Sequence, residues 1–519
     1  MKKVFSIYFL SLALLIGLVC SCSTGPNYGK LIPKDAAFVM SLNVEKAIES
    51  SGLEGEKEPQ EILVKLLKSS NFSRATREKL EEIVDDIDEA GLDLREPLMM
   101  FYSPTYKNEV GLTGAVYDAQ KLENLINAMA REALCNKVNT YGELRYSVMD
   151  KMVLAFNDSW FFVTERKSSQ INEEAVLDEI EGLFMQDEEK SLYGTDVYEK
   201  MSDREGFFQM LLQGEGLRDA LKKYPEFKNI MAGMPQNVDL KDFAYLCDLV
   251  LKKGEILLTG ETLLLSDEAE EWVENFGGYG KIAGDFNAYL PTDAIFQMVA
   301  NVDGADLFKQ VEANGDLAAE LGEQQMNMIK QLMTNVKGDC ALFVEGMISR
   351  TDFPEMALYV QTENADWLDV ALPNLPQRPD SVGENEYSLA LYENNDARMA
   401  NFPPEAYAKF GTRGGVSYLL IGKSPEPFYK VKDTQNAGDG KNAYMRLNIA
   451  ELVDTGIFKD AYGRMEGLIV KQVVAPFDYA EMYTEDKTRM TFRIVMKNKE
   501  DSPVKVVYDQ VFGIVKNFL

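Results

Sequence analysis

Histidine is absent from this 519-residue sequence, and tryptophan occurs only three times. Imidazole is the side chain that titrates nearest neutral pH, and it is the base of Ser-His and Cys-His nucleophiles and the commonest metal ligand. The sequence therefore excludes every catalytic or metal site that depends on an imidazole. Proline is sparse at 18 residues, and the chain is 46% hydrophobic and 27% charged, as in folded globular proteins.

Basic residues are the next shortage. The 54 lysines and arginines are outnumbered by 84 aspartates and glutamates, which gives a formal net charge of −30. Affinity for nucleic acid comes largely from Lys and Arg side chains that neutralise phosphates, and an acidic surface repels phosphate-bearing partners. We therefore predict no nucleic-acid partner, and we expect neutral glycans or basic proteins to be favoured.

Long hydrophobic runs are also scarce, and the mean hydropathy of −0.22 excludes a polytopic membrane protein. The clearest run, Phe5–Val19, has 15 residues and is too short to cross a hydrocarbon core of roughly 30 Å comfortably. The basic start Met1-Lys2-Lys3 precedes the run, and small residues follow it. This order is typical of a secretory signal peptide.

The run ends in Leu18-Val19-Cys20-Ser21-Cys22-Ser23, which resembles a bacterial lipoprotein signal. In such signals a small residue precedes a lipidated cysteine that becomes the first mature residue. Cys22 fits this pattern, whereas Cys20 fits poorly because bulky Val19 would precede the cleavage site. We predict a lipoprotein signal peptide over residues 1–21, lipidation at Cys22 and a polar tether over 22–30. A cleaved signal peptide with an incidental cysteine is the alternative.

The residues after Cys22 suggest a location. Ser23, and not aspartate, follows the cysteine, which under the enterobacterial sorting rule indicates the outer membrane. No acidic cluster of the kind that marks surface-exported lipoproteins follows. We therefore expect an outer-membrane lipoprotein that faces the periplasm, with its membrane contact made through the N-terminal lipid.

Three further cysteines, Cys135, Cys247 and Cys340, lie about a hundred residues apart and form no CxxC pair. An odd number of thiols in an oxidising compartment leaves at least one unpaired. Their apolar neighbours predict buried thiols that pack as small hydrophobic side chains. A Cys247–Cys340 bridge is the alternative.

The sequence contains an internal repeat. Pro33–Val44 and Pro291–Val302 agree at seven of twelve positions, and Ser159–Val163 matches Ser417–Ile421 at the same spacing. Such self-similarity predicts a repeated architecture. We predict a first α+β unit over residues 31–280 and a second over 281–519.

Within each unit, segments of alternating hydrophobicity are interspersed with helical patterns, without a regular strand–helix–strand order. This mixture predicts an α+β fold of two similar units, each an antiparallel sheet with packed helices. Ser73 is expected to cap a helix that begins at Arg74. In the two repeated segments, Phe38 and Met40 alternate as Phe296 and Met298 do, so these side chains are expected to share one buried strand face.

The anchored cysteine, the tether and the repeated Pro33-x-Asp35-Ala36-x-Phe38 motif resemble a family of uncharacterised Bacteroidetes lipoproteins that is classed as a domain of unknown function. The resemblance covers most of the mature chain. It implies location and architecture, and the family supplies no activity or catalytic residue to transfer.

Candidate chemical sites fail on their spacing, so we assign no catalytic residue, metal ligand or cofactor. Asp86–Gly91 begins like a calcium loop but has Ala90 at a ligand position. Gly277–Lys281 lacks the Ser or Thr that a phosphate loop requires. Ser381, in Asp380-Ser381-Val382, resembles a short acceptor pattern for O-glycosylation.

The sequence leaves three functional hypotheses. A non-catalytic binding or scaffold protein with a protein or glycan partner is the leading one. The 24 methionines also fit a carrier of a lipid or other apolar ligand, because flexible thioethers line adaptable apolar surfaces, although core packing is their commoner use. A hydrolase that uses two carboxylates is the third.

We predict that Cys22→Ala yields a protein without lipid, either soluble or unprocessed, because the acyl-accepting thiol is lost. Detergent-phase partitioning and mass spectrometry of the mature N-terminus measure this. An intact residue-1 terminus in the unmodified protein, or unchanged lipid content in the variant, would contradict the prediction.

Overall fold

The structure is a computed structural model, and the residues it describes are 28–53, 57–165, 173–223, 239–313, 315–347, 354–375, 377–391, 406–423, 425–432, 436–455 and 464–516. The predicted signal peptide and Cys22 lie outside the described residues.

Contacts between Cα atoms group the chain into two parts. The N-terminal part comprises Met1–Lys228, Asp239–Ser266 and Asp501–Tyr508, and the C-terminal part comprises Asn229–Val238, Asp267–Glu500 and Asp509–Leu519. The predicted boundary between residues 280 and 281 stays a prediction.

The N-terminal part contains eleven of the described strands and seven helices. The strands are β1 (Phe38–Leu42), β2 (Leu92–Asp93), β3 (Leu98–Tyr102), β4 (Val110–Val116), β5 (Asn139–Tyr141), β6 (Leu144–Met149), β7 (Met152–Phe156), β8 (Trp160–Glu165), β9 (Phe208–Gln213), β10 (Phe243–Lys252) and β11 (Glu255–Leu264). The helices are α2 (Val44–Ser51), α3 (Lys57–Ser69), α4 (Arg74–Asp85), α5 (Ala119–Arg131), α6 (Glu173–Phe184), α7 (Asp196–Ser202) and α8 (Gly214–Lys223).

The C-terminal part contains the other eleven described strands. They are β12 (Tyr279–Gly280), β13 (Phe296–Asp303), β14 (Val336–Met347), β15 (Pro354–Thr362), β16 (Asp380–Gly383), β17 (Glu386–Ala390), β18 (Tyr407–Arg413), β19 (Val416–Gly422), β20 (Ala443–Asn448), β21 (Phe477–Thr484) and β22 (Arg489–Met496). Its helices are α10 (Asp267–Asn275), α11 (Gly304–Ala313), α12 (Gly315–Met333), α13 (Trp367–Ala371), α14 (Ile449–Thr455) and α16 (Arg464–Val474), and α17 (Pro503–Lys516) spans the division between the parts.

The predicted fold class, two similar units that each hold a separate antiparallel sheet, is wrong. The described residues form one large antiparallel sheet of 22 strands, with 14 helices, and strands and helices take similar shares of the chain. Alternating hydrophobicity identifies strands, but it carries no information on which strand edges pair. Unpaired N–H and C=O groups at a strand edge favour further pairing, which extends a sheet.

The order of strand pairing recurs along this sheet. In the N-terminal part it is β5-β6-β7-β8-β4-β3-β1-β9-β10-β11, with β2 added to β4. In the C-terminal part it is β16-β17-β18-β19-β15-β14-β13-β20-β21-β22, with β12 added to β13. The similar segments Pro33–Val44 and Pro291–Val302 contain β1 and most of β13, which occupy the same place in these orders. The sequence similarity therefore corresponds to a repeated pairing order within one sheet.

The helix cap predicted at Ser73 is confirmed, and two further caps are present. Ser73 accepts a hydrogen bond from the backbone N–H of Thr76 (3.3 Å) and caps α4. Asn43 accepts one from Lys46 N–H (2.8 Å) at the start of α2, and Asp303 caps α11 through the N–H groups of Ala305 and Asp306. Such caps satisfy backbone donors that a helix start leaves unpaired. Within the described residues, no helix combines the length and the apolar character that a membrane span requires.

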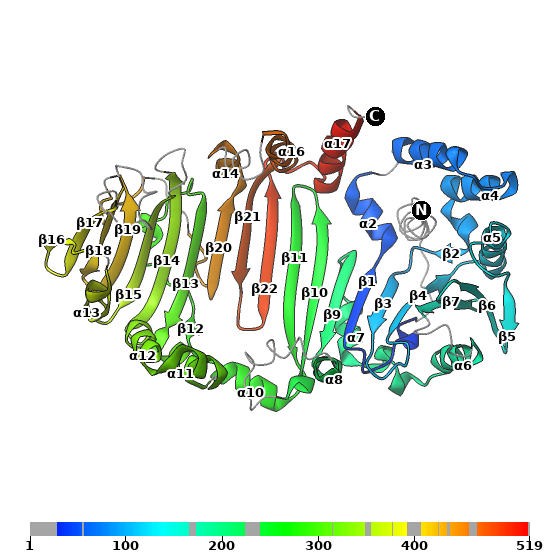
Figure 1. The fold of residues 1–519 in the computed structure, drawn as a ribbon, viewed down its shortest axis with the longest axis horizontal. Helices are drawn as coiled ribbons and strands as arrows, with labels where there is room; N and C mark the ends of the chain where they lie inside the picture. Colours follow the sequence, from blue (N-terminus) through cyan, green and yellow to red (C-terminus); the bar gives the residue numbers. More distant parts are fainter. Residues whose placement is uncertain are drawn as a thin grey trace. The chain divides into compact units, whose positions relative to one another are not determined.

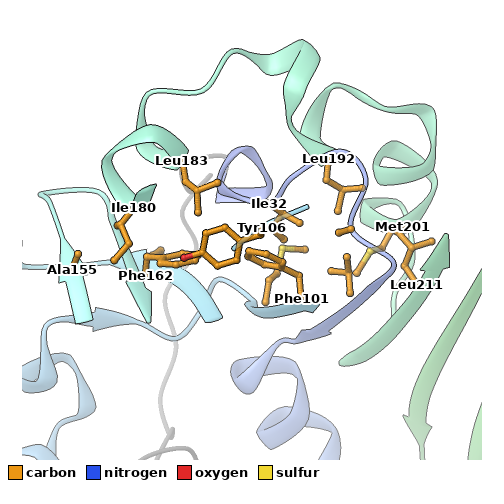
Figure 2. Close-up of a cluster of buried hydrophobic side chains, with 14 of the residues drawn as sticks. Ile32, Phe101, Tyr106, Ala155, Phe162, Ile180, Leu183, Leu192, Met201 and Leu211 are labelled. Carbon is orange, nitrogen blue, oxygen red and sulfur yellow. The ribbon is translucent and has the colours of Figure 1, made fainter. Parts of the chain in front are cut away.

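In the N-terminal part, helices and loops cover one face of the sheet. Ile180 and Leu183 of α6 point toward Tyr106 and Phe162, and Phe101 lies beside them (Figure 2). The ring centroids of Phe101 and Phe162 are 6.0 Å apart. The apolar stripe of α6 buries this aromatic core, and Val176 and Leu177 of the same helix belong to it. A second cluster forms on the other side of β4, β7 and β8, where α5 packs.

In the C-terminal part, the segment that precedes β13 covers one face of the sheet. Ile282, Phe286 and Leu290 pack on side chains of β13, β14, β15 and β19, including Phe343 and Tyr359. We call this side of the C-terminal sheet the closed face. In Figure 1, α11 and α12 lie at one end of strands β13–β15, and α14 and α16 lie at the opposite end of β20 and β21.

A single buried carboxylate fastens this cover to the sheet. Asp339 of β14 is fully buried, and its oxygens accept hydrogen bonds from the backbone N–H groups of Ala283, Gly284 and Asp285 at 2.9–3.1 Å. The Asn301 amide donates a fourth hydrogen bond at 2.8 Å. Charge-assisted hydrogen bonds of this kind are about twice as strong as neutral ones.

We predict that Asp339→Ala lowers the free energy of unfolding by about 3 kcal/mol, because four donors lose their acceptor at a fully buried position. Urea unfolding followed by circular dichroism measures this change. Asp187→Ala is the matched control, since Asp187 is exposed and its side chain makes no capping hydrogen bond. Equal unfolding midpoints for the two variants would show that the buried carboxylate does not contribute to stability.

Candidate binding surface

The face of the C-terminal sheet opposite the closed face carries an unusual row of side chains. On β13, Gln297 and Val299 are buried on the closed face, whereas Met298 between them is 41% exposed. Successive side chains on a strand point to opposite faces, and directly paired residues of antiparallel strands share a face. The strand register therefore identifies the neighbours of Met298 on this side.

We call that side the open face. Its central row runs across six strands, from β15 to β22, with each residue paired to the next: Leu358, Leu342, Met298, Met445, Met482 and Phe492. The adjacent row, from Met356 of β15 to Ile494 of β22, is also entirely apolar. Apart from Met298, these side chains are half-buried, and none belongs to a hydrophobic core cluster of the described residues.

Three charged side chains of β20, β21 and β22, namely Arg446, Glu481 and Arg493, lie on the closed face. Glu481 of β21 is only 8% exposed and accepts hydrogen bonds from Arg493 Nε (2.9 Å) and from the Tyr444 hydroxyl (3.2 Å). Burial, followed by the nearby Glu481 carboxylate, raises the pKa of Tyr444 to about 12. The Arg446 guanidinium lies 3.9 Å from the centroid of the Tyr479 ring. The usual arrangement is thus inverted, with charges on the covered side and apolar side chains on the open side.

This inversion corrects a sequence-based expectation. Phe38, Met40, Phe296 and Met298 were expected to share a buried face, and that expectation is wrong. The first three are half-buried and Met298 is exposed, while the intervening residues, such as Val39, are buried. Alternation separates the two faces of a strand, but it does not state which face the rest of the chain covers.

The N-terminal part has a shorter methionine row of its own. Met40 of β1 pairs directly with Met100 of β3 and with Met210 of β9, and all three are half-buried. Met99, the neighbour of Met100 in sequence, points to the opposite face and belongs to the buried core cluster of the N-terminal part. Core packing therefore accounts for Met99 but not for Met100. Only the strand register assembles this row, because its members are far apart in sequence.

Helices at the ends of the C-terminal strands also expose apolar side chains. Leu468 on α16 is 57% exposed, Ile469 beside it is exposed, and so is Met328 on α12. Contiguous exposed apolar surface marks sites of interaction in soluble proteins. The open face is therefore the candidate functional surface of the C-terminal part.

The remaining candidates from the sequence do not converge on this surface. Ser381 lies on the exposed strand β16, where its hydroxyl donates a 3.3 Å hydrogen bond to Gly383 O, and its glycosylation stays a prediction. Asp86 of the calcium-like segment instead caps a 3-10 helix by accepting a hydrogen bond from Asp88 N–H (3.0 Å). Among the described residues, no group of three or more His, Cys, Asp or Glu side chains is arranged to hold a metal ion.

Cys135, Cys247 and Cys340 are all free thiols, so the alternative of a Cys247–Cys340 bridge is wrong. Cys247 is buried as predicted, whereas the other two are half-buried. Burial, and then the neighbouring Asp339 carboxylate, raises the pKa of Cys340 to about 12. A thiol with so high a pKa is protonated at neutral pH and is a poor nucleophile.

One further buried acid belongs to the N-terminal part. Asp248 of β10 is almost completely buried, and it accepts hydrogen bonds from Gly206 N–H (3.0 Å) and the Gln209 amide (3.4 Å). Burial raises the pKa of this carboxyl above its ordinary value, although both hydrogen bonds oppose the rise. These hydrogen bonds join β9 and the segment before it to β10, so the role of Asp248 is structural.

Comparisons with known proteins give a family and little else. A family model described as a domain of unknown function (DUF4836) matches residues 28–503, so the expected resemblance is confirmed at that level, while its Bacteroidetes and lipoprotein aspects stay predictions. No curated protein matches the chain. Crystal form I of TP0453 is 14% identical, with a TM-score of 0.25, and covers 46% of this chain and 80% of its own. Crystal form III of TP0453 is 12% identical, with a TM-score of 0.26. The match covers 50% of this chain and 90% of that one.

We predict that Asp248→Asn changes how stability depends on pH. The pKa of Asp248 is higher in the folded state than in the unfolded state, so at pH values between these two pKa values the folded state binds more protons. The free energy of unfolding therefore falls as the pH rises through that range. The asparagine of the variant does not titrate, so the variant does not lose stability in this way. The difference in urea midpoint, variant minus natural protein, should therefore increase as the pH rises from about 4 toward neutrality. The exposed Asp187→Asn control should keep a constant difference. A constant difference for Asp248→Asn as well would refute the prediction.

Proposed function

The chain belongs to the family described as a domain of unknown function (DUF4836), and from that premise we propose that it is a non-catalytic binding or scaffold protein of the cell envelope, held at the membrane by a lipid on Cys22. The observation that carries the binding role is the open face of the C-terminal sheet. Leaving two apolar rows partly exposed to water costs free energy, at roughly 25 cal/mol per Å². A partner that covers the rows recovers this free energy.

The polar groups support a binding role over chemistry. The buried carboxylates described above, Asp339, Glu481 and Asp248, each accept hydrogen bonds from named groups of the fold. Their partners hold strands and loops together. We therefore assign these carboxylates a structural role, as buried charges that are paired with hydrogen-bond donors of the fold.

The envelope location rests on the sequence. A basic start, a 15-residue apolar run and Cys22 after a small residue support lipidation, and Ser23 after the cysteine supports the outer membrane with the protein facing the periplasm. Two or more acyl chains give a lasting anchor without a membrane-spanning helix.

A photo-cross-linker tests the binding role in intact cells. Benzoylphenylalanine in place of Met298, on the open face, should give a covalent adduct on irradiation, which mass spectrometry then identifies. The matched control is the same substitution at Met185, which is 78% exposed and lies outside the open face. Absence of any adduct at Met298, or equal adducts at both positions, would overturn the proposed function. An adduct with membrane lipid alone would favour a carrier of apolar ligands.

A further inference from the structure

We propose that the open face of the C-terminal sheet binds a basic amphipathic α-helix of a partner protein. This inference rests on the proposed binding function and names the class of partner. Three features of the open face support it: the pairing of its strands, its dimensions and the charge around it.

The strand pairing favours a helix over an extended segment. Strands β13, β14, β15, β20 and β21 each pair with a neighbour on both sides, so their backbone N–H and C=O groups are already used. An occupant of this face therefore meets side chains only and has to satisfy its own backbone hydrogen bonds. An α-helix does so internally, whereas a single extended segment does not.

The dimensions of the face suit one helix. Six strands at about 4.8 Å spacing give the central row a length of about 24 Å, which is about four turns or 16 residues of helix. The two apolar rows lie about 7 Å apart along the strands, comparable with the apolar stripe of a helix about 10 Å wide. Three adjacent methionines, Met298, Met445 and Met482, give the row side chains that adapt to an incoming surface.

The surrounding charge specifies a basic partner. The two rows contain no charged residue, so they contact only the apolar stripe of the helix. On the helices at the two ends of the strands, α11 and α12 and then α14 and α16, lysines are outnumbered by acids among the described side chains: Asp306, Glu312, Glu323, Glu451, Asp454 and Glu466 against Lys309, Lys330 and Lys471. The chain as a whole carries −30. Complementary charge steers a basic partner to this face and repels a second copy of the chain.

The test uses a synthetic helix and the soluble form of the full chain with Cys22→Ala, so that no detergent competes for the apolar face. The probe is a fluorescent peptide of about 16 residues, in which the leucines are spaced to lie on one face of an α-helix and the lysines on the opposite face. A second peptide has the same composition, with its leucines spread around the helix. Fluorescence anisotropy should show binding of the first peptide and at least tenfold weaker binding of the second.

Substitutions on the row locate the site. Met298→Asp should weaken peptide binding at least tenfold, Met298→Gln by a smaller factor, and Met298→Leu by less than twofold. Met185→Asp, a matched change at an exposed methionine elsewhere, should leave binding unchanged. Circular dichroism establishes that each variant is folded, and Met298→Gln keeps the test valid if Met298→Asp does not fold.

Three results would overturn the inference. Equal binding of the two peptides would show that charge alone attracts them. An unchanged affinity of a folded Met298→Asp variant would place the peptide elsewhere. Binding of phosphatidylcholine vesicles that depends on Met298, without peptide binding, would identify a lipid surface. In each case a cross-link at Met298 in cells can still occur, so failure of this inference is distinct from failure of the proposed function.

Discussion

The hydrogen bonds to Asp339 are the interaction on which the C-terminal part depends. Three consecutive backbone N–H groups and one side-chain amide converge on a carboxylate that is fully buried on β14. They hold residues 283–285 against the sheet, and this places Ile282, Phe286 and Leu290 over the closed face. A buried carboxylate without these donors would be strongly unfavourable, so the cover and the charge stabilise each other.

The cover on the closed face of the C-terminal sheet determines which side chains remain on the open face. Because side chains alternate along each strand, a single cover buries Gln297 and Val299 and leaves Met298 toward the other side. Arg446 and Arg493 lie on the closed face with Glu481, which accepts hydrogen bonds there from Tyr444 and Arg493. What remains is an apolar surface with its backbone groups already paired, and this combination favours a partner that brings its own secondary structure.

Much of the local structure was predictable from the sequence. Ser73 caps its helix, and the segments after Pro33 and Pro291 are strands. The candidate surface was not predictable, because its members are brought together by register. Met298, Met445 and Met482 are separated by 147 and 37 residues, and no local pattern links them. The abundance of methionine was the only signal, and core packing explains methionine equally well.

The sequence alone determined composition, charge, the lack of imidazole chemistry, the predicted anchor at Cys22 and the repeat around Pro33 and Pro291. These properties depend on residue types and on short spacings along the chain. The tertiary structure decided that the strands form one sheet, which face of the C-terminal sheet is covered, and that Cys247 and Cys340 stay unpaired. Those outcomes depend on contacts between residues far apart in the chain, and period-two alternation is the same whichever face is buried.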